Sequence, residues 1–144
     1  MVEFKVVIGT KDGKSYQKEL KDAEADALHD KLLGETVSGD ALGFAGYEFL
    51  ITGGSDKCGF PMRKGIQKPR QKIMIGNSVG YSGKQRSTKK NKNRKQSGIV
   101  KRRTVCGERI TKIIRQVNLK VTKQGSAPLG EAPAPAQGEE KKEE

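Results

Sequence analysis

The chain has 144 residues, of which 29 are Lys or Arg and 17 are Asp or Glu, so its net charge is +12 and its isoelectric point is about 9.8. Hydrophobic residues make up 33% of the chain, and Trp is absent. This composition argues against a large enclosed substrate cavity and favours a modest core over part of the chain. The sequence has no apolar run long enough to predict a membrane-spanning helix. Charges inside the first apolar run are not typical of a signal peptide.

The first predicted element is a strand in which Val2, Phe4, Val6 and Ile8 share one face. Residues 11–14 contain Asp-Gly, which is typical of a hairpin turn because Gly accepts a positive φ without a Cβ clash. A second, more polar strand over residues 15–20 is therefore predicted to return from this turn.

A helix is predicted next, with Asp22 as its N-cap and Gly34 as its stop. The helix would run through Leu33 and carry a narrow apolar stripe of Ala23, Ala27, Leu28 and Leu32. Its shortness favours a position at the end of a sheet.

Three further strands are predicted. One is marked by the alternation of Tyr47, Phe49 and Ile51, and one covers residues 71–76. In the longest, a face interrupted only by Arg115 is shared by Ile113, Val117, Leu119 and Val121. Short strands with Gly-rich turns predict a mostly β fold, a small antiparallel β-barrel with one short helix. An open sheet with the helix packed on it is the alternative.

The sign of the charge changes along the chain. Residues 1–61 hold 7 basic and 11 acidic side chains, whereas residues 62–123 hold 20 basic side chains and one acid, Glu108. Positive charge confined to one half predicts a binding surface for a polyanion. Much of it lies in residues 77–103, which are polar between the cations and are predicted to form an extended basic arm between two strands.

The predicted domain organisation is a single β domain over residues 1–125, including the basic arm 77–103, followed by a tail. Residues 126–144 are rich in Ala and Pro and then acidic, with 5 acids against 2 lysines from residue 124 onward. Such a composition is typical of a disordered end.

Catalytic chemistry is poorly represented. The single histidine, His29, falls within the predicted helix and is interpreted as a partly exposed polar residue. Cys58 and Cys106 lack metal-ligand spacing and are interpreted as reduced, buried or half-buried thiols. No phosphate-binding glycine motif is present. We therefore predict no catalytic site, metal, cofactor or small-molecule substrate.

Residues 51–62, ITGGSDKCGFPM, form the most distinctive segment. The adjacent glycines predict a tight turn with close backbone approach, and Asp56 is placed to accept hydrogen bonds from main-chain amides of its own loop. Phe60 and Met62 would return to the core, and Arg63 and Lys64 would emerge into the basic half. Phosphate or sugar contact and a purely structural turn are both open interpretations of this loop.

This segment resembles the signature loop of the archaeal and eukaryotic-type small-subunit ribosomal protein six family. The matching positions are an aliphatic residue followed by Gly53, Gly54, Asp56, Gly59, Pro61 and Met62. The preceding VSGDALGFAGYEFL, the following KRRTVCGERI and the strand VNLKVTKQG are similar to the family's segments as well. The resemblance covers about residues 1–125 and implies a small β-barrel bound to small-subunit ribosomal RNA.

Two departures from the family pattern stand out. The basic arm is richer in Lys and Asn than the Arg-rich segment of the family, with extra length around residues 89–98. The acidic tail replaces the long basic C-terminal helix with phosphorylated serines that eukaryotic members carry. The short form is therefore similar to archaeal members.

The charge pattern and the resemblance together predict a structural constituent of the small ribosomal subunit, with a role in translation and subunit assembly. Its predicted location is the cytoplasmic ribosome, and its predicted partners are ribosomal RNA and neighbouring ribosomal proteins. Tyr81 could stack on a base or pack at the barrel edge. The predicted RNA-binding cations are Arg63, Lys64, Lys68, Arg70, Lys84, Arg86, Lys89, Lys90, Lys92, Arg94, Lys95, Lys101, Arg102, Arg103 and Arg109.

Two other classes of function are compatible with parts of the sequence. A free basic nucleic-acid-binding protein of the chromatin type would use the same cations, and the run KKNKNRK suits a nuclear-import signal. An enzyme acting on RNA would need a general base or metal cluster beside the arm, and the sequence offers no convergent set.

Overall fold

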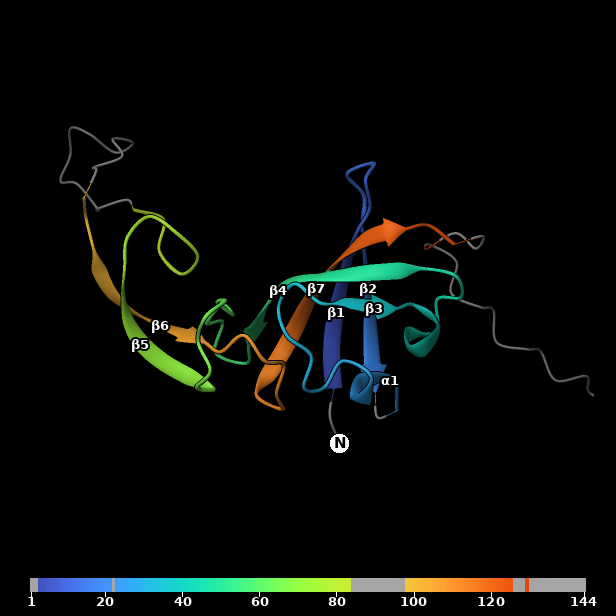
Figure 1. Ribbon diagram of the computed structural model, residues 1–144, viewed down its shortest axis with the longest axis horizontal. Helices are drawn as coiled ribbons and strands as arrows, with labels where there is room; N and C mark the ends of the chain where they lie inside the picture. Colours follow the sequence, from blue (N-terminus) through green and yellow to red (C-terminus); the bar gives the residue numbers. More distant parts are fainter. Residues whose placement is uncertain (1–2, 22, 84–97, 126–128, 130–144) are drawn as a thin grey trace, which may run out of the picture.

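The computed structural model of the protein describes residues 3–21, 23–83, 98–125 and 129 (Figure 1). The described part contains one short α-helix and a 3-10 turn among strands, which confirms the mostly β fold class. The strands are β1 (Glu3–Gly9), β2 (Ser15–Lys21), β3 (Thr36–Ser38), β4 (Glu48–Asp56), β5 (Arg70–Ile75), β6 (Lys101–Cys106) and β7 (Ile114–Lys123); the helix is α1 (Ala23–Asp26) and the 3-10 turn is η1 (Asp40–Leu42).

Five strands form a curled half-barrel in the order β2-β1-β7-β4-β3 (Figure 1). The β1–β2 hairpin has the predicted turn, since Gly9 pairs with Ser15 and Gly13 has a φ of 82°. The sheet remains open because β2 and β3 are its edge strands, and one of its pairs, β1–β7, is parallel. The first and last described strands of the domain thus lie side by side.

The core lies on the concave face of the half-barrel and follows the period-two pattern of the sequence. Phe4, Val6 and Ile8 of β1 are buried as predicted, and so are Phe49 and Ile51 of β4. Phe49 stacks on Tyr47 with ring centroids 5.8 Å apart. In β7 the buried side chains are Ile114, Val117, Leu119 and Val121. The predicted Ile113 precedes this strand and is only partly buried, because the β4–β7 register shifts between Ser55 and Asp56.

The predicted helix over residues 22–33 is wrong in extent, since α1 ends at Asp26. After α1 the chain continues in turns to Asp30, which adopts the left-handed region with a φ of 63° and so cannot continue a helix. The main chain after it pairs with residues 108–110: Asp30 N–H donates to Ile110 O over 3.0 Å and Leu33 N–H to Glu108 O over 3.1 Å. Non-local hydrogen bonds therefore replace the helical ones. Leu28 is buried, as its place in the apolar stripe predicted.

Strands β5 and β6 form a separate two-stranded sheet that extends from one end of the half-barrel (Figure 1). This β5–β6 sheet has its own small core of Ile66, Ile75, Tyr81 and Val105. Strand β5 was predicted, but β6 was not: its first residues, Lys101, Arg102 and Arg103, belong to the predicted arm 77–103. The structure therefore places the end of that arm in a regular strand.

Much of the arm and the tail lies outside the described residues. This applies to Lys84, Arg86, Lys89, Lys90, Lys92, Arg94 and Lys95 of the arm and to the predicted tail apart from Leu129. Leu129 itself packs against the main core. The division at residue 125 and the disorder of the tail stay predictions.

The adjacent glycines of the distinctive loop do not form the predicted turn. Both lie within β4, which runs on to Asp56 with a register shift between Ile51 and Gly53. Gly54 is needed for close packing, because a Cβ there would lie 2.5 Å from Gln116 O and 2.8 Å from Met62 Sδ. At Gly53 the corresponding space is open. Of the two glycines, only Gly54 is required by close packing, whereas Gly53 has room for a side chain.

Replacing Gly54 with Ala should lower the free energy of unfolding by about 1–3 kcal/mol, because overpacking against main-chain atoms of β7 forces a backbone shift. The matched Gly53→Ala variant should stay within about 0.5 kcal/mol of the parent. Urea unfolding followed by circular dichroism measures both. Equal effects of the two substitutions would contradict this role of Gly54.

Candidate nucleic-acid interface

Eight of the described cations of the basic half lie on the β5–β6 sheet and the loop that leads to it, and the other five lie on β7 or in the segment just before it. In the antiparallel register, Arg70, Lys72 and Met74 pair with Cys106, Thr104 and Arg102. Directly paired residues project from the same face, so one face carries Arg70, Lys72 and Arg102 around an exposed Met74. Lys64 and Lys68, in the preceding loop, are exposed as well. The sheet thus presents cations on a surface with little acidic charge.

The single acid of this half does not offset these cations on the sheet. Glu108 uses Oε2 to accept the Gly65 N–H over 2.7 Å, at the base of the loop that leads to β5. Its own N–H donates to Ile66 O over 2.8 Å. Glu108 therefore holds the loop, and the exposed face of the β5–β6 sheet stays cationic.

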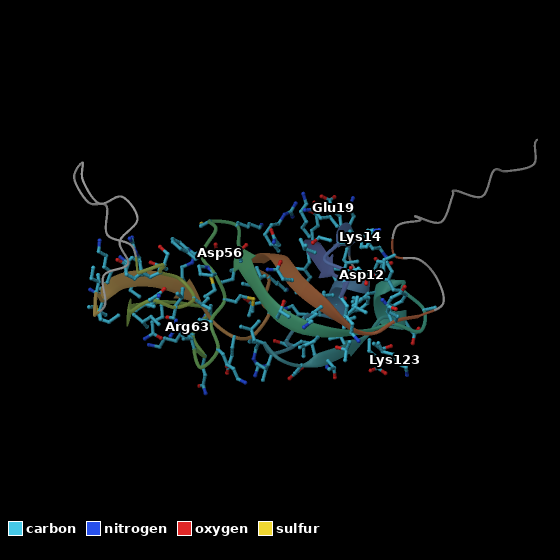
Figure 2. The ribbon with its side chains drawn as sticks, turned by 90° about the horizontal axis from the view of Figure 1, so that it is seen from above. Asp12, Lys14, Glu19, Asp56, Arg63 and Lys123 are labelled. Carbon is cyan, nitrogen blue, oxygen red and sulfur yellow. The ribbon has the colours of Figure 1, made fainter. Side chains whose placement is uncertain are left out.

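Asp56 lies where the half-barrel meets the β5–β6 sheet (Figure 2). Its side chain is fully buried, and Oδ1 accepts the N–H of Cys58 over 2.8 Å and that of Phe60 over 3.0 Å, as the predicted Asx-type turn requires. Oδ2 accepts hydrogen bonds from the Arg70 guanidinium and the Cys106 thiol. Because Arg70 begins β5 and Cys106 ends β6, one carboxylate fixes the root of both strands. We call this cluster the Asp56 junction.

The electrostatics of the junction keep Asp56 ionised. Burial by itself raises the pKa of this carboxyl, but hydrogen bonds from Phe60, Cys106, Arg70 and Cys58 outweigh it, so the pKa lies below its usual value. The hydrogen bond to Asp56 raises the pKa of Arg70 in turn. Burial, with the hydrogen bond to Asp56 and its negative charge, raises the pKa of the Cys106 thiol to about 11. Cys106 is therefore a neutral hydrogen-bond donor.

Tyr81 packs in the core of the β5–β6 sheet. Tyr81 is only 7% exposed, so of the two predicted roles it has the packing role, and its ring is not accessible to a base. Lys101 Nζ lies 5.9 Å and Arg103 Cζ 5.6 Å from its ring centroid. Both distances are within cation–π range. Tyr81 therefore holds two cations of β6 in place.

Three predicted arginines make hydrogen bonds or ion pairs within the protein. Arg63 donates from Nη1 to Ser78 Oγ and to Val79 O, each over 2.8 Å, which ties the loop after β5 to the chain before it. Arg109 lies 3.7 Å from Asp30 on the half-barrel side. Arg70 belongs to the Asp56 junction. Lys64, Lys68, Lys72, Arg102 and Arg103 have no ion pair within the part of the chain that the structure describes.

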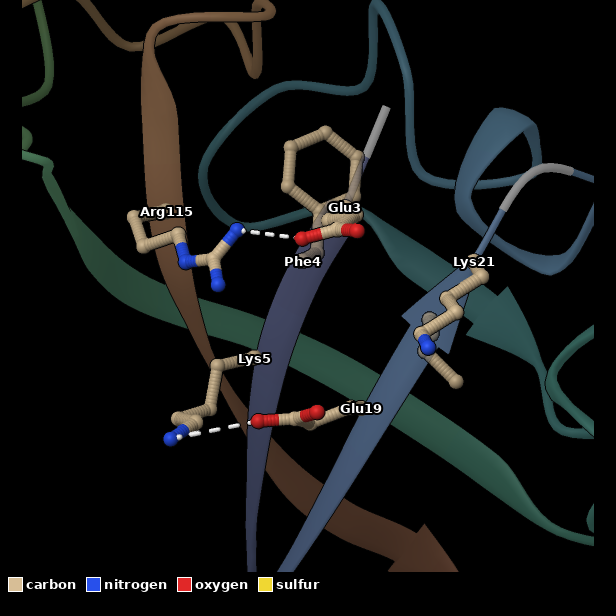
Figure 3. Close-up of a pocket in the computed structure, with 7 residues that line it drawn as sticks. Glu3, Phe4, Lys5, Glu19, Lys21 and Arg115 are labelled. Atoms are coloured by element: carbon tan, nitrogen blue, oxygen red, sulfur yellow. Dashed lines mark hydrogen bonds and ion pairs between the residues drawn. The ribbon is translucent and has the colours of Figure 1, made fainter. Parts of the chain in front are cut away.

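An open groove of about 510 Å³ runs along the outer edge of β6. One wall is the loop Gly59–Pro61, the other is formed by residues 80–82, and Arg102, Arg103 and Thr104 line its floor. A second hollow, between β1, β2 and Arg115, measures only about 10 Å³ (Figure 3). It is framed by ion pairs of Glu3 with Arg115 at 2.8 Å and of Lys5 with Glu19 at 3.3 Å. That hollow has room for about one water.

No catalytic constellation appears among the described residues. His29 is partly exposed, as predicted, and its Nδ1 lies 3.1 Å from Asp30. Cys106 is buried as predicted, whereas Cys58 is exposed, so the prediction of a buried or half-buried thiol is wrong for Cys58. The described residues contain no group of three His, Cys, Asp or Glu side chains that could hold a metal ion. No described helix is long and apolar enough to cross a membrane.

Sequence reasoning missed part of this site. It found the main-chain hydrogen bonds of Asp56 but assigned Arg70 to nucleic acid and left Cys106 without a partner. The link depends on the pairing of Arg70 with Cys106 across 36 positions of chain, which no local pattern indicates. The only signal was an acid, Asp56, placed directly before a long basic segment.

The chain matches the family model described as Ribosomal protein S6e over residues 4–133. It belongs to the ribosomal protein S6e family. It is 40% identical over 132 residues to the small ribosomal subunit protein eS6 of Methanococcus maripaludis strain C6, covering 90% of this chain and 95% of that protein. The proteins of the same name from Methanospirillum hungatei and Archaeoglobus fulgidus are 38% and 37% identical, covering 96% and 95% of their lengths.

Membership of the S6e family confirms the resemblance found in the sequence, including its archaeal character. It identifies the chain as a structural ribosomal protein and not an enzyme, in agreement with the prediction. It also confirms the predicted ribosomal location.

Stability should depend on the ionisation of Asp56. A carboxyl with a lowered folded-state pKa contributes stability above its unfolded pKa, near 3.9, and loses it as the pH falls through the folded value. Asp56→Asn should therefore lower the free energy of unfolding by about 1–3 kcal/mol at neutral pH, because a buried hydrogen-bond donor then loses its partner. The cost should shrink as the pH falls below about 4.

Urea titrations over this pH range measure the difference between parent and variant. Asp12→Asn, in the exposed turn between β1 and β2, is the matched control and should change little at any pH. A penalty for Asp56→Asn that does not vary with pH would contradict ionisation as the cause.

The two thiols of the S6e protein should react at very different rates. At a pH of about 8, Cys106 is both buried and protonated, because its pKa is about 11, so a thiol reagent should label one cysteine rapidly in the native chain. The second should react only on unfolding. The Cys58→Ser variant should lose the fast phase, and a fast phase that persists would place Cys106 in contact with solvent.

Proposed function

We propose that this S6e protein binds small-subunit ribosomal RNA through the β5–β6 sheet and the loop before it, and thereby takes part in subunit assembly. The observation that carries the proposal is the cluster of exposed cations on an element that extends from the half-barrel. The small-subunit relatives support the ribosomal partner by their names. Neighbouring ribosomal proteins are the other partners of such a constituent.

The roles of the cations differ. Lys64, Lys68, Lys72 and Arg102 are exposed and replace condensed counter-ions along the RNA backbone. Arg70, Arg63 and Arg109 add positive charge, but their contacts within the protein make positioning their main contribution. The arm cations between residues 84 and 97 extend the same surface in this proposal, on the evidence of their sequence alone.

The half-barrel supplies a rigid support for this surface. The half-barrel itself is nearly neutral, because the excess of acids over bases in residues 1–61 is largely offset by Arg115, Lys120 and Lys123 of β7. An RNA-facing element and a non-binding body are thus separated within one domain, here proposed to span residues 1–125. A free chromatin-type protein would use the same cations, but family membership favours the ribosome.

A tagged full-length chain should sediment with small subunits at low salt and resist a moderate salt wash. If roughly 8 phosphates are neutralised, the affinity for ribosomal RNA should fall with a log–log salt slope of about −6 to −7. A chain that stays at the top of the gradient at both salt concentrations would overturn the proposal and favour the free nucleic-acid binder.

Charge reversal separates the proposed surface from the rest of the molecule. Lys68→Glu with Lys72→Glu should weaken RNA binding by more than tenfold and flatten the salt slope by about 2 to 4. The control pair Lys11→Glu with Lys14→Glu changes the net charge equally, at the exposed β1–β2 turn. It should have a much smaller effect, and equal losses would refute a localised binding surface.

A further inference from the structure

The outer edge of β6 has main-chain groups that no described element pairs with. Cys106 donates its N–H to Pro61 O over 2.9 Å and accepts the Arg63 N–H over 3.1 Å, so both of its polar groups point away from β5. The direction alternates along a strand. The N–H and C=O groups of Thr104 and Arg102 therefore also point away from β5, toward the groove.

The groove along this edge is lined by groups suited to an anionic chain. Arg102 and Arg103 project from opposite faces of β6, one on each side of the edge, and no acid is among the lining residues. Thr104 and Ser82 add hydroxyl groups. Its volume of about 510 Å³ falls in the range of small-ligand sites, roughly 300–1,000 Å³. A short stretch of single strand matches this size, whereas a double helix does not.

Arg103 is held in position for stacking. Its guanidinium lies over the ring of Tyr81, with Cζ 5.6 Å from the centroid, while the residue as a whole is exposed. The ring thus supports the guanidinium on one side, and the exposure of the residue leaves it accessible from solvent. An arginine plane of this kind can stack on an unpaired base.

We propose that the β6-edge groove binds a short single-stranded stretch of RNA, with phosphate oxygens on the edge N–H and guanidinium groups and one base stacked on Arg103. The 2′-hydroxyl and the base edges supply donors for the outward C=O groups of β6, which phosphate alone cannot do. The assignment rests on the proposed function and adds the form of RNA and the residues that hold it. Binding in the groove differs from neutralisation of the RNA backbone by the exposed lysines, because those lysines would bind duplex and single-stranded RNA equally well.

Nuclear magnetic resonance of the ¹⁵N-labelled full-length chain tests the groove directly. The probe is a uridine pentanucleotide at about 0.15 M salt, compared with a short RNA duplex of equal total charge. We expect amide shifts at residues 59–61, 80–82 and 102–104 with the single strand, and slower hydrogen exchange at the Arg102 and Thr104 amides. Shifts confined to other basic residues, or the same groove shifts with the duplex, would overturn the proposal.

Two substitutions separate stacking from charge. Arg103→Lys keeps a cation beside Tyr81 but loses the planar group, and should weaken pentanucleotide binding about tenfold. Lys14→Gln removes a charge at the exposed β1–β2 turn, outside the groove, and should weaken pentanucleotide binding no more than about twofold. Thermal melting checks that both variants fold. Equal affinities of Arg103→Lys and the parent would refute the stacked base.

Cross-linking in assembled subunits distinguishes this proposal from strand addition by a partner protein and from failure of the proposed function itself. Ultraviolet cross-links from residues 101–106 to RNA support the groove, whereas cross-links from these residues only to another protein would show strand addition by a partner and overturn it. If the chain enters subunits but residues 101–106 give no cross-links to RNA, the proposed function stands and the proposal for the groove is refuted. If the chain does not enter subunits, both the proposed function and the proposal for the groove are refuted.

Discussion

The Asp56 carboxylate is the interaction on which the arrangement of this S6e protein depends. It ends β4, and its neighbours in the sheet and in space are the first residue of β7, the first residue of β5 and the last residue of β6. With four strands meeting at one buried anion, the orientation of the cationic sheet relative to the half-barrel is set by hydrogen-bond geometry. A buried anion is costly unless its lone pairs are satisfied, and here both oxygens have partners.

Separating the cations from the half-barrel resolves a conflict between binding and folding. A surface that attracts RNA must leave its cations unpaired, and unpaired like charges repel one another. The acids of residues 1–61 pair instead with lysines and arginines of the half-barrel, as Glu3 does with Arg115 and Glu48 with Lys123. These exposed pairs contribute little to stability. Among the described residues, the acids that contact the cationic β5–β6 sheet and its loop are Glu108 and Asp56, and both are engaged in hydrogen bonds within the protein.

The sequence predicted what local pattern encodes. Alternation found β1, β4, β5 and most of β7, the Asp-Gly turn found the hairpin and the β2 strand that returns from it, and the Asx pattern found the bonds to Oδ1 of Asp56. The sequence-based prediction was wrong where contacts between segments far apart in the chain determine the local structure. The helix was overextended because residues 30–33 pair with residues 108–110, and Gly54 was assigned to a turn because its contact with β7 lies more than 60 residues away. Arg70 was interpreted as a free cation because its partnership with Cys106 exists only in the folded register.

The junction also determines the shape of the groove beside it. Oδ1 of Asp56 fixes the amides of Cys58 and Phe60, and so holds the loop Gly59–Pro61 that forms one wall. Oδ2 holds Cys106, from which the β6 edge extends through Thr104 to Arg102. One anion therefore positions a wall and the floor before any ligand arrives. A preformed site loses less conformational entropy on binding. A negative charge that would repel RNA if it were exposed can therefore, when buried here, strengthen the proposed binding of an RNA strand.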